Sequence, residues 1–402
     1  MTSARTESRA RFEISTETRR RLVLGVSRAW AWVFLFGLIA FFTVSIWFRE
    51  DINFLNLRNT QLILSTIVSV LLMGLGQTFV IISGGIDLSV GWVMGLASVI
   101  SARTTLILGD AGMSDTIAIA GGFVVALAAA SVVGTISGVI IAKLRVPSFI
   151  VTLGMAFVVR GLALIVSGGQ TIGGMPAIMR DFGNESLLYW VHGEGGGLSV
   201  LTKPEVSSEA LRSMDRLLPW PVVITAITVA IAIFLLHKTQ FGRHTYAIGG
   251  NREASVRAGV PADWQTIKIF ALSAFTAGLA GCLHTARFSG GSAIAGDPLL
   301  LNSIAAVIIG GVSMYGGRGN VMGTVIGALI IAILVTGLIM LQVDPFVQFV
   351  IIGIVVIMAV LIDQARDLVA GRAESQGVRS RRRPWPTSPS SRSATWSSAS
   401  AA

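Results

Sequence analysis

Apolar runs of about twenty residues follow one another along most of the chain, and short polar stretches separate them. A helix of that length crosses a hydrocarbon core of about 30 Å. The pattern therefore predicts an all-α, polytopic membrane protein with about ten membrane-spanning helices. We place these helices at residues 29–48, 60–82, 88–107, 116–142, 148–167, 219–237, 266–288, 303–316, 321–341 and 345–363.

Basic residues gather at the two ends of the chain and in short loops between the apolar runs. Arginines precede the first run, and Lys143 and Lys238 lie in loops that this topology places on the same side. Because Lys and Arg are enriched in cytoplasmic loops, we expect both termini in the cytoplasm. The net charge of +10 then reflects orientation in the membrane and not binding to nucleic acid. The outward loops hold Asp110, Asp115, Asp297 and Asp344.

Composition agrees with lipid as the surrounding solvent. Hydrophobic residues make up 53% of the 402 residues and charged residues 13%, and the mean hydropathy is +0.74. About a quarter of an ordinary soluble domain is charged. The single cysteine, Cys282, excludes a disulfide within the chain. The histidines lack metal-ligand spacing and no nucleophile motif appears, so we expect no catalytic residue, no metal and no cofactor.

We divide the chain into three parts. A basic cytoplasmic segment covers residues 1–28, a transmembrane domain covers 29–365, and a basic tail covers 366–402. The tail is rich in Arg, Ser and Pro and has no apolar period, so we expect disorder there. The transmembrane domain includes an external loop at 168–217, which is either a partner surface or a tolerated insertion. Its stretch near 207–217 is compatible with a short helix.

The largest inward loop, residues 238–265, contains signals for a short helix. After a turn at Gly249-Gly250, Asn251 can cap a helix that has Glu253 in its first turn. Gly259 is suited to end this helix before Pro261. Either a compact charged helix is presented to the cytoplasm, or the segment is an ordinary connector on the membrane surface.

The segment from Gly76 to Gly91 predicts a broken helix between the second and third spans. Gly84 and Gly85 interrupt the helix, and Ser83 or Asp87 can cap the next one. The freed backbone groups must be buried in protein or line water. The break belongs to a translocation path, or Asp87 simply caps the third span at the cytoplasmic interface.

Arg160 lies about 18 Å into the fifth span, at 1.5 Å per residue. An unpaired guanidinium facing lipid there would cost at least about 2.5 kcal/mol. We therefore expect Arg160 to face protein or water, with Asp87 or backbone carbonyls as its partner. It is then a gate residue on a path or a structural tie between helices.

These sequence segments resemble those of a known family. Glu253-Ala254-Ser255 followed by Gly259 resembles the EAA loop of importer permeases, with Ser255 in place of the usual second alanine. The longer segment 241–259 is similar to the corresponding segment in the ribose, xylose and galactose branch of ATP-binding-cassette importers, and so is GGIDLSVG at 84–91. Further matches at 147–154, 160–161, 303–313 and 316–319 extend the resemblance over residues 61–363. Leu300 and Asn302 depart from it, because family members usually carry Glu and Asp there.

The resemblance implies a membrane-spanning subunit of the bacterial inner membrane that imports a monosaccharide of the pentose or hexose class. It implies separate ATPase subunits, an extracytoplasmic binding protein and a second permease chain, most simply an identical copy. The inward loop is then the coupling helix. Residues implied for coupling are Gly242, Arg243, Gly250, Asn251, Glu253, Ala254, Ser255 and Gly259. Residues expected along the path are Gln77, Ser83, Gly84, Gly85, Asp87, Ser89, Thr152, Arg160 and Asn302.

Two alternatives stay open. The chain contains no GxxxxGK[ST] phosphate loop, so any ATP must be held by another subunit. An ion-coupled secondary transporter would need a carboxylate at membrane depth, for which Asp87 is the best choice. A permease for another solute, such as amino acids, is the other alternative.

Overall fold

The computed structural model describes residues 16–50, 54–191, 197–200, 215–358 and 361. The chain divides into two units, one formed by residues 29–361 and the other by residues 1–28 together with 362–402. The first unit is described below. The predicted tail 366–402 and most of the N-terminal segment 1–28 lie outside the described residues.

Helices dominate the described residues, which confirms the all-α, polytopic prediction. Among them, eight helices are long and apolar enough to cross a membrane, namely α1, α2, α3, α4, α5, α8, α11 and α13. Two apolar helices are shorter, α12 and the segment Pro345–Met358. The helices are α1 Thr16–Glu50, α2 Leu57–Ile82, α3 Val90–Asp110, α4 Asp115–Leu144, α5 Ser148–Ser167, α6 Ala177–Asn184, α8 Trp220–Lys238, α9 Gln240–Gly250, α10 Arg252–Arg257, α11 Ala262–Phe288, α12 Asp297–Ile309 and α13 Val321–Met340.

Four of the long helices form the interior and four lie at its edge. In α2, α3, α11 and α13 at least 72% of the span is buried, whereas in α1, α4, α5 and α8 at most 33% is buried. Glycines let neighbouring backbones touch: a Cβ on Gly134 of α4 would lie 2.3 Å from the Phe270 carbonyl of α11. The apolar outer faces of the edge helices are therefore available to lipid or to another chain.

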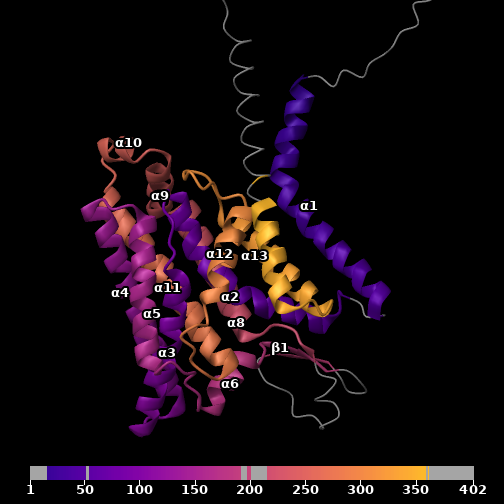
Figure 1. Ribbon diagram of the computed structural model, residues 1–402, viewed down its shortest axis with the longest axis vertical. Coiled ribbons are helices and arrows are strands. Elements are labelled where there is room, and N and C mark those ends of the chain that lie inside the picture. The colour runs from indigo at the N-terminus through magenta and orange to yellow at the C-terminus, as the bar shows by residue number, and fades with distance from the viewer. Residues whose placement is uncertain (1–15, 51–53, 192–196, 201–214, 359–360, 362–402) are drawn as a thin grey trace, which may run out of the picture. The chain divides into compact units, whose positions relative to one another are not determined.

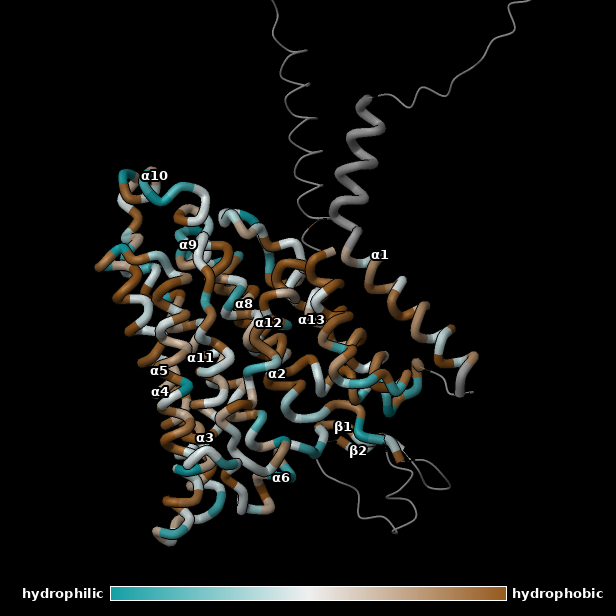
Figure 2. The backbone as a smooth tube through the Cα atoms, viewed as in Figure 1, coloured by the Kyte–Doolittle hydropathy of each residue, from teal (hydrophilic) through white to brown (hydrophobic). Residues whose placement is uncertain are grey.

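Polar segments gather mostly at two opposite ends of this unit (Figure 2). Figure 1 shows α9 and α10 at one end and α6 with β1 at the other. Near α6 the strands β1 Leu188–Trp190, β2 Leu198–Val200 and β3 Asp215–Arg216 form a small antiparallel sheet in the order β2-β1-β3. Most of the short helix expected near 207–217 lies outside the described residues. At 215–216 that expectation is wrong, because this pair forms β3.

The span predicted at 303–316 is correct only for residues 303–309, because residues 310–316 are not helical. The helix here is α12, and it is preceded by a non-helical segment, residues 289–296, that runs beside α3. A Cβ on Gly95 of α3 would lie 2.0 Å from the Ala293 carbonyl, and a Cβ on Gly91 would lie 2.8 Å from the Gly296 carbonyl. Small residues permit this contact, and a hydropathy pattern does not reveal it.

The same segment moves Asp297 away from its expected position. We expected Asp297 in an outward loop, but it begins α12 beside the first turn of α3. The opposite end of α3, at Asp110, is about 28 Å away along the helix. Asp297 therefore lies far from the end of α3 at which we expected it.

Candidate functional site

The predicted break between the second and third spans is present. Helix α2 ends at Ile82, Gly84 has a φ of +84°, and α3 begins at Val90. The cap that we expected at Ser83 or Asp87 is wrong, because Ser89 is the N-terminal cap residue of α3 and Ser83 ends α2. Residues 83–89 thus form a non-helical segment between the two helices, called here the helix break.

Side chains from two neighbouring helices satisfy the backbone of the helix break. Ser148 Oγ of α5 accepts the Ile86 N–H at 3.1 Å, and Thr152 Oγ1 accepts the Leu88 N–H at 3.1 Å. The Gln77 side-chain amide of α2 donates to the Asp87 carbonyl. The freed polar groups are therefore paired within the protein, one of the two arrangements that membrane depth allows. Ser148 was absent from the residues we expected here.

Asp87 is held at the centre of this arrangement. Its side chain is 1% exposed, and Oδ1 accepts hydrogen bonds from the Ser89 N–H at 2.9 Å and from Ser89 Oγ at 2.6 Å. Oδ2 accepts from Ser273 Oγ of α11 at 2.9 Å. Ser273 lies 186 residues further along the chain, so no local sequence pattern indicates this contact. The Asp87 carboxylate therefore ties the helix break to α11.

The cytoplasmic loop folds into two helices, α9 and α10. Asn251 caps α10 by accepting the Ala254 N–H at 2.9 Å, which confirms the predicted cap, and Gly259 has a φ of +84° just beyond α10. The turn expected at Gly249-Gly250 is instead the last part of α9. Glu253, Ala254 and Val256 are exposed, whereas Ser255 is buried and faces the protein. Helix α10 therefore presents a free outer face.

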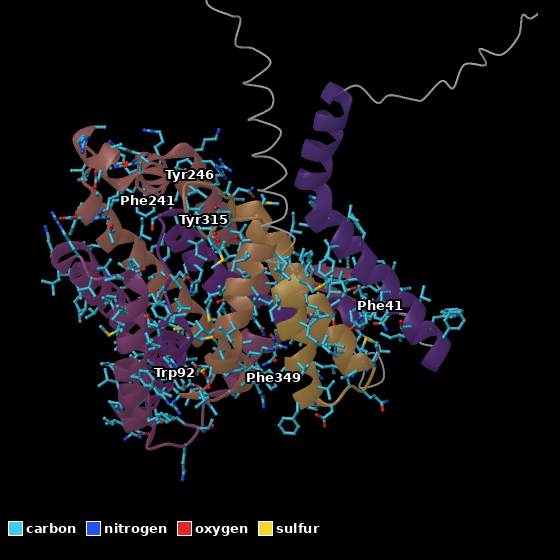
Figure 3. The ribbon with its side chains drawn as sticks, turned by 45° about the horizontal axis from the view of Figure 1, so that its top comes forward. Phe41, Trp92, Phe241, Tyr246, Tyr315 and Phe349 are labelled. Atoms are coloured by element: carbon cyan, nitrogen blue, oxygen red, sulfur yellow. The ribbon has the colours of Figure 1, made fainter. Side chains whose placement is uncertain are left out.

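Helix α9 is fastened to the membrane-spanning helices around it. Gln265 of α11 donates to the Phe241 carbonyl at 2.8 Å and to Thr245 Oγ1 at 3.0 Å. Tyr246 Oη donates to the Gly319 carbonyl at 2.6 Å, and burial raises the pKa of Tyr246, which keeps this donor protonated. Figure 3 shows Phe241 and Tyr246 toward the end that carries α9 and α10. Gly242 packs on the end of α8, while Arg243 is exposed.

Glycines from three distant parts of the chain meet where α9 ends. A Cβ on Gly249 would lie 1.8 Å from the Ile82 carbonyl at the end of α2. A Cβ on Gly316 would lie 2.8 Å from the Gly249 carbonyl and 3.1 Å from Gly84 Cα. The Gly317 N–H donates to the Ile82 carbonyl at 2.8 Å. We call this contact the glycine junction, formed by Gly84, Gly249, Gly316 and Gly317.

The glycine junction joins the base of α10 to the helix break through backbone atoms. Gly316 and Gly317 have φ of +82° and +71°, a region that other residues rarely adopt. A Cβ on Gly249, Gly316 or Gly317 would lie 1.8, 2.8 or 3.1 Å from backbone atoms of another segment. Protein interiors are close-packed and yield little to displacement. A movement of α9 and α10 must therefore displace the end of α2 or the loop 310–320.

Two other residues expected on the path lie apart from Asp87. Arg160 is exposed on α5, and its guanidinium lies 4.6 Å from the centre of the Trp92 ring. Its expected pairing with Asp87 is therefore wrong, because serines occupy the oxygens of that carboxylate. Asn302 is half-buried in α12. Figure 3 shows Trp92 well away from Tyr246 and the α9 end.

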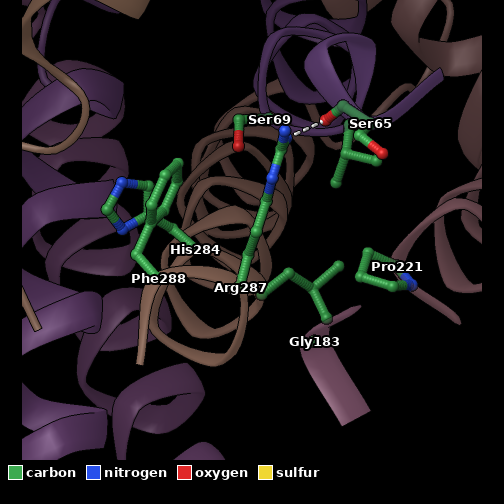
Figure 4. A pocket seen from close by; sticks show the side chains of 9 residues that line it. Ser65, Ser69, Gly183, Pro221, His284, Arg287 and Phe288 are labelled. Atoms are coloured by element: carbon green, nitrogen blue, oxygen red, sulfur yellow. Dashed lines mark hydrogen bonds between the residues drawn. The ribbon is translucent and has the colours of Figure 1, made fainter. Parts of the chain in front are cut away.

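A pocket lies near the opposite end, where α2, α6, α8 and α11 meet (Figure 4). Arg287 reaches into it and donates to the Ser65 carbonyl at 2.5 Å. Ser69, His284 and Phe288 complete its walls, and Asn184 of α6 donates to the Arg287 carbonyl at 2.9 Å. The bond from Arg287 holds α11 to α2 at this end.

Comparisons with known proteins identify relatives of this chain. The family described as branched-chain amino acid transport system / permease component matches residues 59–360. The chain is 34% identical over 315 residues to the ribose import permease of Escherichia coli strain K12, which covers 78% of this chain and 88% of the relative. It is 33% identical over 312 residues to the fructose import permease of Rhizobium meliloti, covering 78% and 79%. It is 32% identical over 359 residues to the xylose transport system permease of Haemophilus influenzae, covering 81% and 93%. No solved structure matches the chain.

Proposed function

The chain belongs to the family of branched-chain amino acid transport system permease components, and from this premise we propose that it imports a monosaccharide across the bacterial inner membrane, driven by ATP hydrolysis on separate subunits. The relatives named above are permeases for ribose, fructose and xylose. Their similarity extends over more than three quarters of this chain. This similarity supports a sugar, rather than an amino acid, as the cargo.

One observation carries the mechanism: the backbone of Gly249, three residues before the start of α10, lies directly against the Ile82 carbonyl at the edge of the helix break. A partner that binds the exposed face of α10 can move α9 without contacting the membrane-spanning helices. The glycine junction then passes this displacement to α2 and to the loop that follows α12. Binding outside the membrane thereby changes the helix break within it.

The partners follow from this arrangement. The sequence has no phosphate loop of the GxxxxGK[ST] type, so ATPase subunits that bind α10 would supply the hydrolysis. An extracytoplasmic binding protein would deliver the sugar at the α6 end. A second identical chain would cover the apolar outer faces of the edge helices and enclose a path. Both termini then lie in the cytoplasm, as the distribution of basic residues indicates.

Replacing Glu253 by lysine tests the docking role of α10. The Glu253 side chain is 85% exposed and its contact with Arg257 is long at 3.5 Å, so folding should be unaffected. We expect ATPase subunits to co-purify at no more than about a tenth of the wild-type amount, because a reversed charge at a docked surface costs at least about 1.4 kcal/mol. Uptake of ribose, xylose or fructose into vesicles should fall in parallel.

The matched control is Asp110→Lys, which makes the same change of charge at an exposed position on the opposite end. It should leave co-purification and uptake unchanged. If Glu253→Lys also left both unchanged, α10 would not be the docking helix. The ligand of the binding protein that co-purifies with the wild-type chain would identify the sugar.

A further inference from the structure

Two side chains of opposite charge are exposed within the membrane-spanning part of the single chain. Arg160 lies on α5, and Asp297 lies at the start of α12. Among the residues that the structure describes, neither side chain has a hydrogen bond or an ion pair. Arg160 makes a cation–π contact with the Trp92 ring. Two such groups, each next to a residue in the first turn of α3, need an explanation that the packing of the single chain does not supply.

Both groups lie well inside the membrane. Arg160 is about 18 Å from the start of α5 at Ser148. Asp297 is about 18 Å from the far end of α12, beyond which Gly310 packs on Gly323 in the first turn of α13. A charge at such a depth is costly unless it faces water or a partner group. A neighbour other than lipid is therefore favoured for both side chains.

The start of α3 brings the two groups into one neighbourhood. The guanidinium of Arg160 rests on the ring of Trp92, which is 7% exposed and therefore held firmly in the protein. The adjacent residue, Gly91, contacts the backbone of Gly296, which immediately precedes Asp297. Consecutive residues of one buried helix thus anchor both charged groups.

The chemistry of the pair fits a polyhydroxylated solute. The guanidinium offers five N–H donors, and the carboxylate offers acceptors. Sugar hydroxyl groups both donate and accept, so one hydroxylated ring can use both groups. We infer that Arg160 and Asp297 form the polar contact that a monosaccharide makes inside the membrane, with Trp92 as a positioning residue that holds the guanidinium. This inference rests on the proposed function.

The test uses the complex of the full chain with its ATPase subunits and binding protein, reconstituted in vesicles with ATP. Arg160→Gln and Asp297→Asn should each lower sugar uptake by about tenfold or more, while the chain still co-purifies with its ATPase subunits. Arg58→Gln, which removes an exposed arginine at the outer end of α2, is the matched control and should stay within about twofold of wild type. Trp92→Leu should also lower uptake, and Trp92→Phe, which keeps an aromatic face, should restore most of it.

Three outcomes would overturn the inference in distinguishable ways. Unchanged uptake in Arg160→Gln or Asp297→Asn, beside ATP-driven sugar uptake in the wild type, would refute the cargo contact alone. Uptake restored by combining Arg160→Asp with Asp297→Arg would show an ion pair between two copies of the chain instead. A wild-type complex that does not move sugar with ATP would remove the proposed function together with the inference.

Discussion

Replacing Gly249 by alanine is expected to lower ATP-driven sugar uptake strongly while the ATPase subunits stay bound. The added methyl group would lie 1.8 Å from the Ile82 carbonyl, so the glycine junction must open. Overpacking of this kind costs about 1–3 kcal/mol, and each 1.4 kcal/mol corresponds to a factor of ten. We therefore expect uptake to fall about tenfold or more. The measurement is sugar accumulated per ATP hydrolysed in reconstituted vesicles.

The neighbouring glycine provides the control. A Cβ on Gly250 meets nothing within 4 Å, although Gly250 is the adjacent residue in the same helix. Gly250→Ala should therefore transport as well as the wild type. Thermal unfolding of both variants shows whether either change affects folding. Normal transport by Gly249→Ala, or an equal loss in Gly250→Ala, would show that this backbone contact does not transmit movement.

The second large effect is expected at Asp87, where alanine and asparagine should differ. Asp87→Ala leaves the donors of Ser89 and Ser273 without an acceptor in the protein interior. An unpaired buried polar group costs about 1–3 kcal/mol, so the midpoint of thermal unfolding should drop by several degrees. Asp110→Ala, at an exposed position, should leave the midpoint unchanged.

Asp87→Asn separates a structural tie from an ion carrier. The amide oxygen can still accept both bonds from Ser89, and Ser273 can turn to accept from the amide nitrogen. We therefore expect Asp87→Asn to keep at least about half of the uptake. An ion-coupled transporter needs a carboxylate that takes up and releases a cation, so asparagine would abolish its transport. Abolished uptake in a stable Asp87→Asn protein would thus favour ion coupling.

The apolar pattern located most of the helices because their length is set by the membrane. It failed between residues 289 and 320, where apolar and small residues alternate without forming one continuous helix. The segment 289–296 is non-helical because Gly91, Gly95 and Gly296 allow backbones to touch, and this requires a specific neighbour. Hydropathy reports only the preference of each residue for lipid. It therefore merged the end of α12 and the following loop into one span.

The candidate site was predicted unevenly for a related reason. Signals that act within a few residues were visible, such as Asn251 as a cap and Gly84 as a breaker. Contacts between distant parts of the chain were not visible. They include the hydrogen bond from Ser273 to Asp87 and the cation–π contact of Arg160 with Trp92. The glycine pairs at 84–85, 249–250 and 316–317 are visible in the sequence, but no pattern there indicates that Gly84, Gly249 and Gly316 meet.

Dependence on ATP alone is the most direct test of the proposed import mechanism. The full chain, its co-purifying ATPase subunits and its binding protein are placed in vesicles without an ion gradient, and labelled sugar is followed. Coupling through α10 predicts accumulation inside the vesicles only when ATP is supplied to the side that carries α9 and α10. Accumulation driven by a proton or sodium gradient, in vesicles that hold this chain without any ATPase subunit, would contradict it.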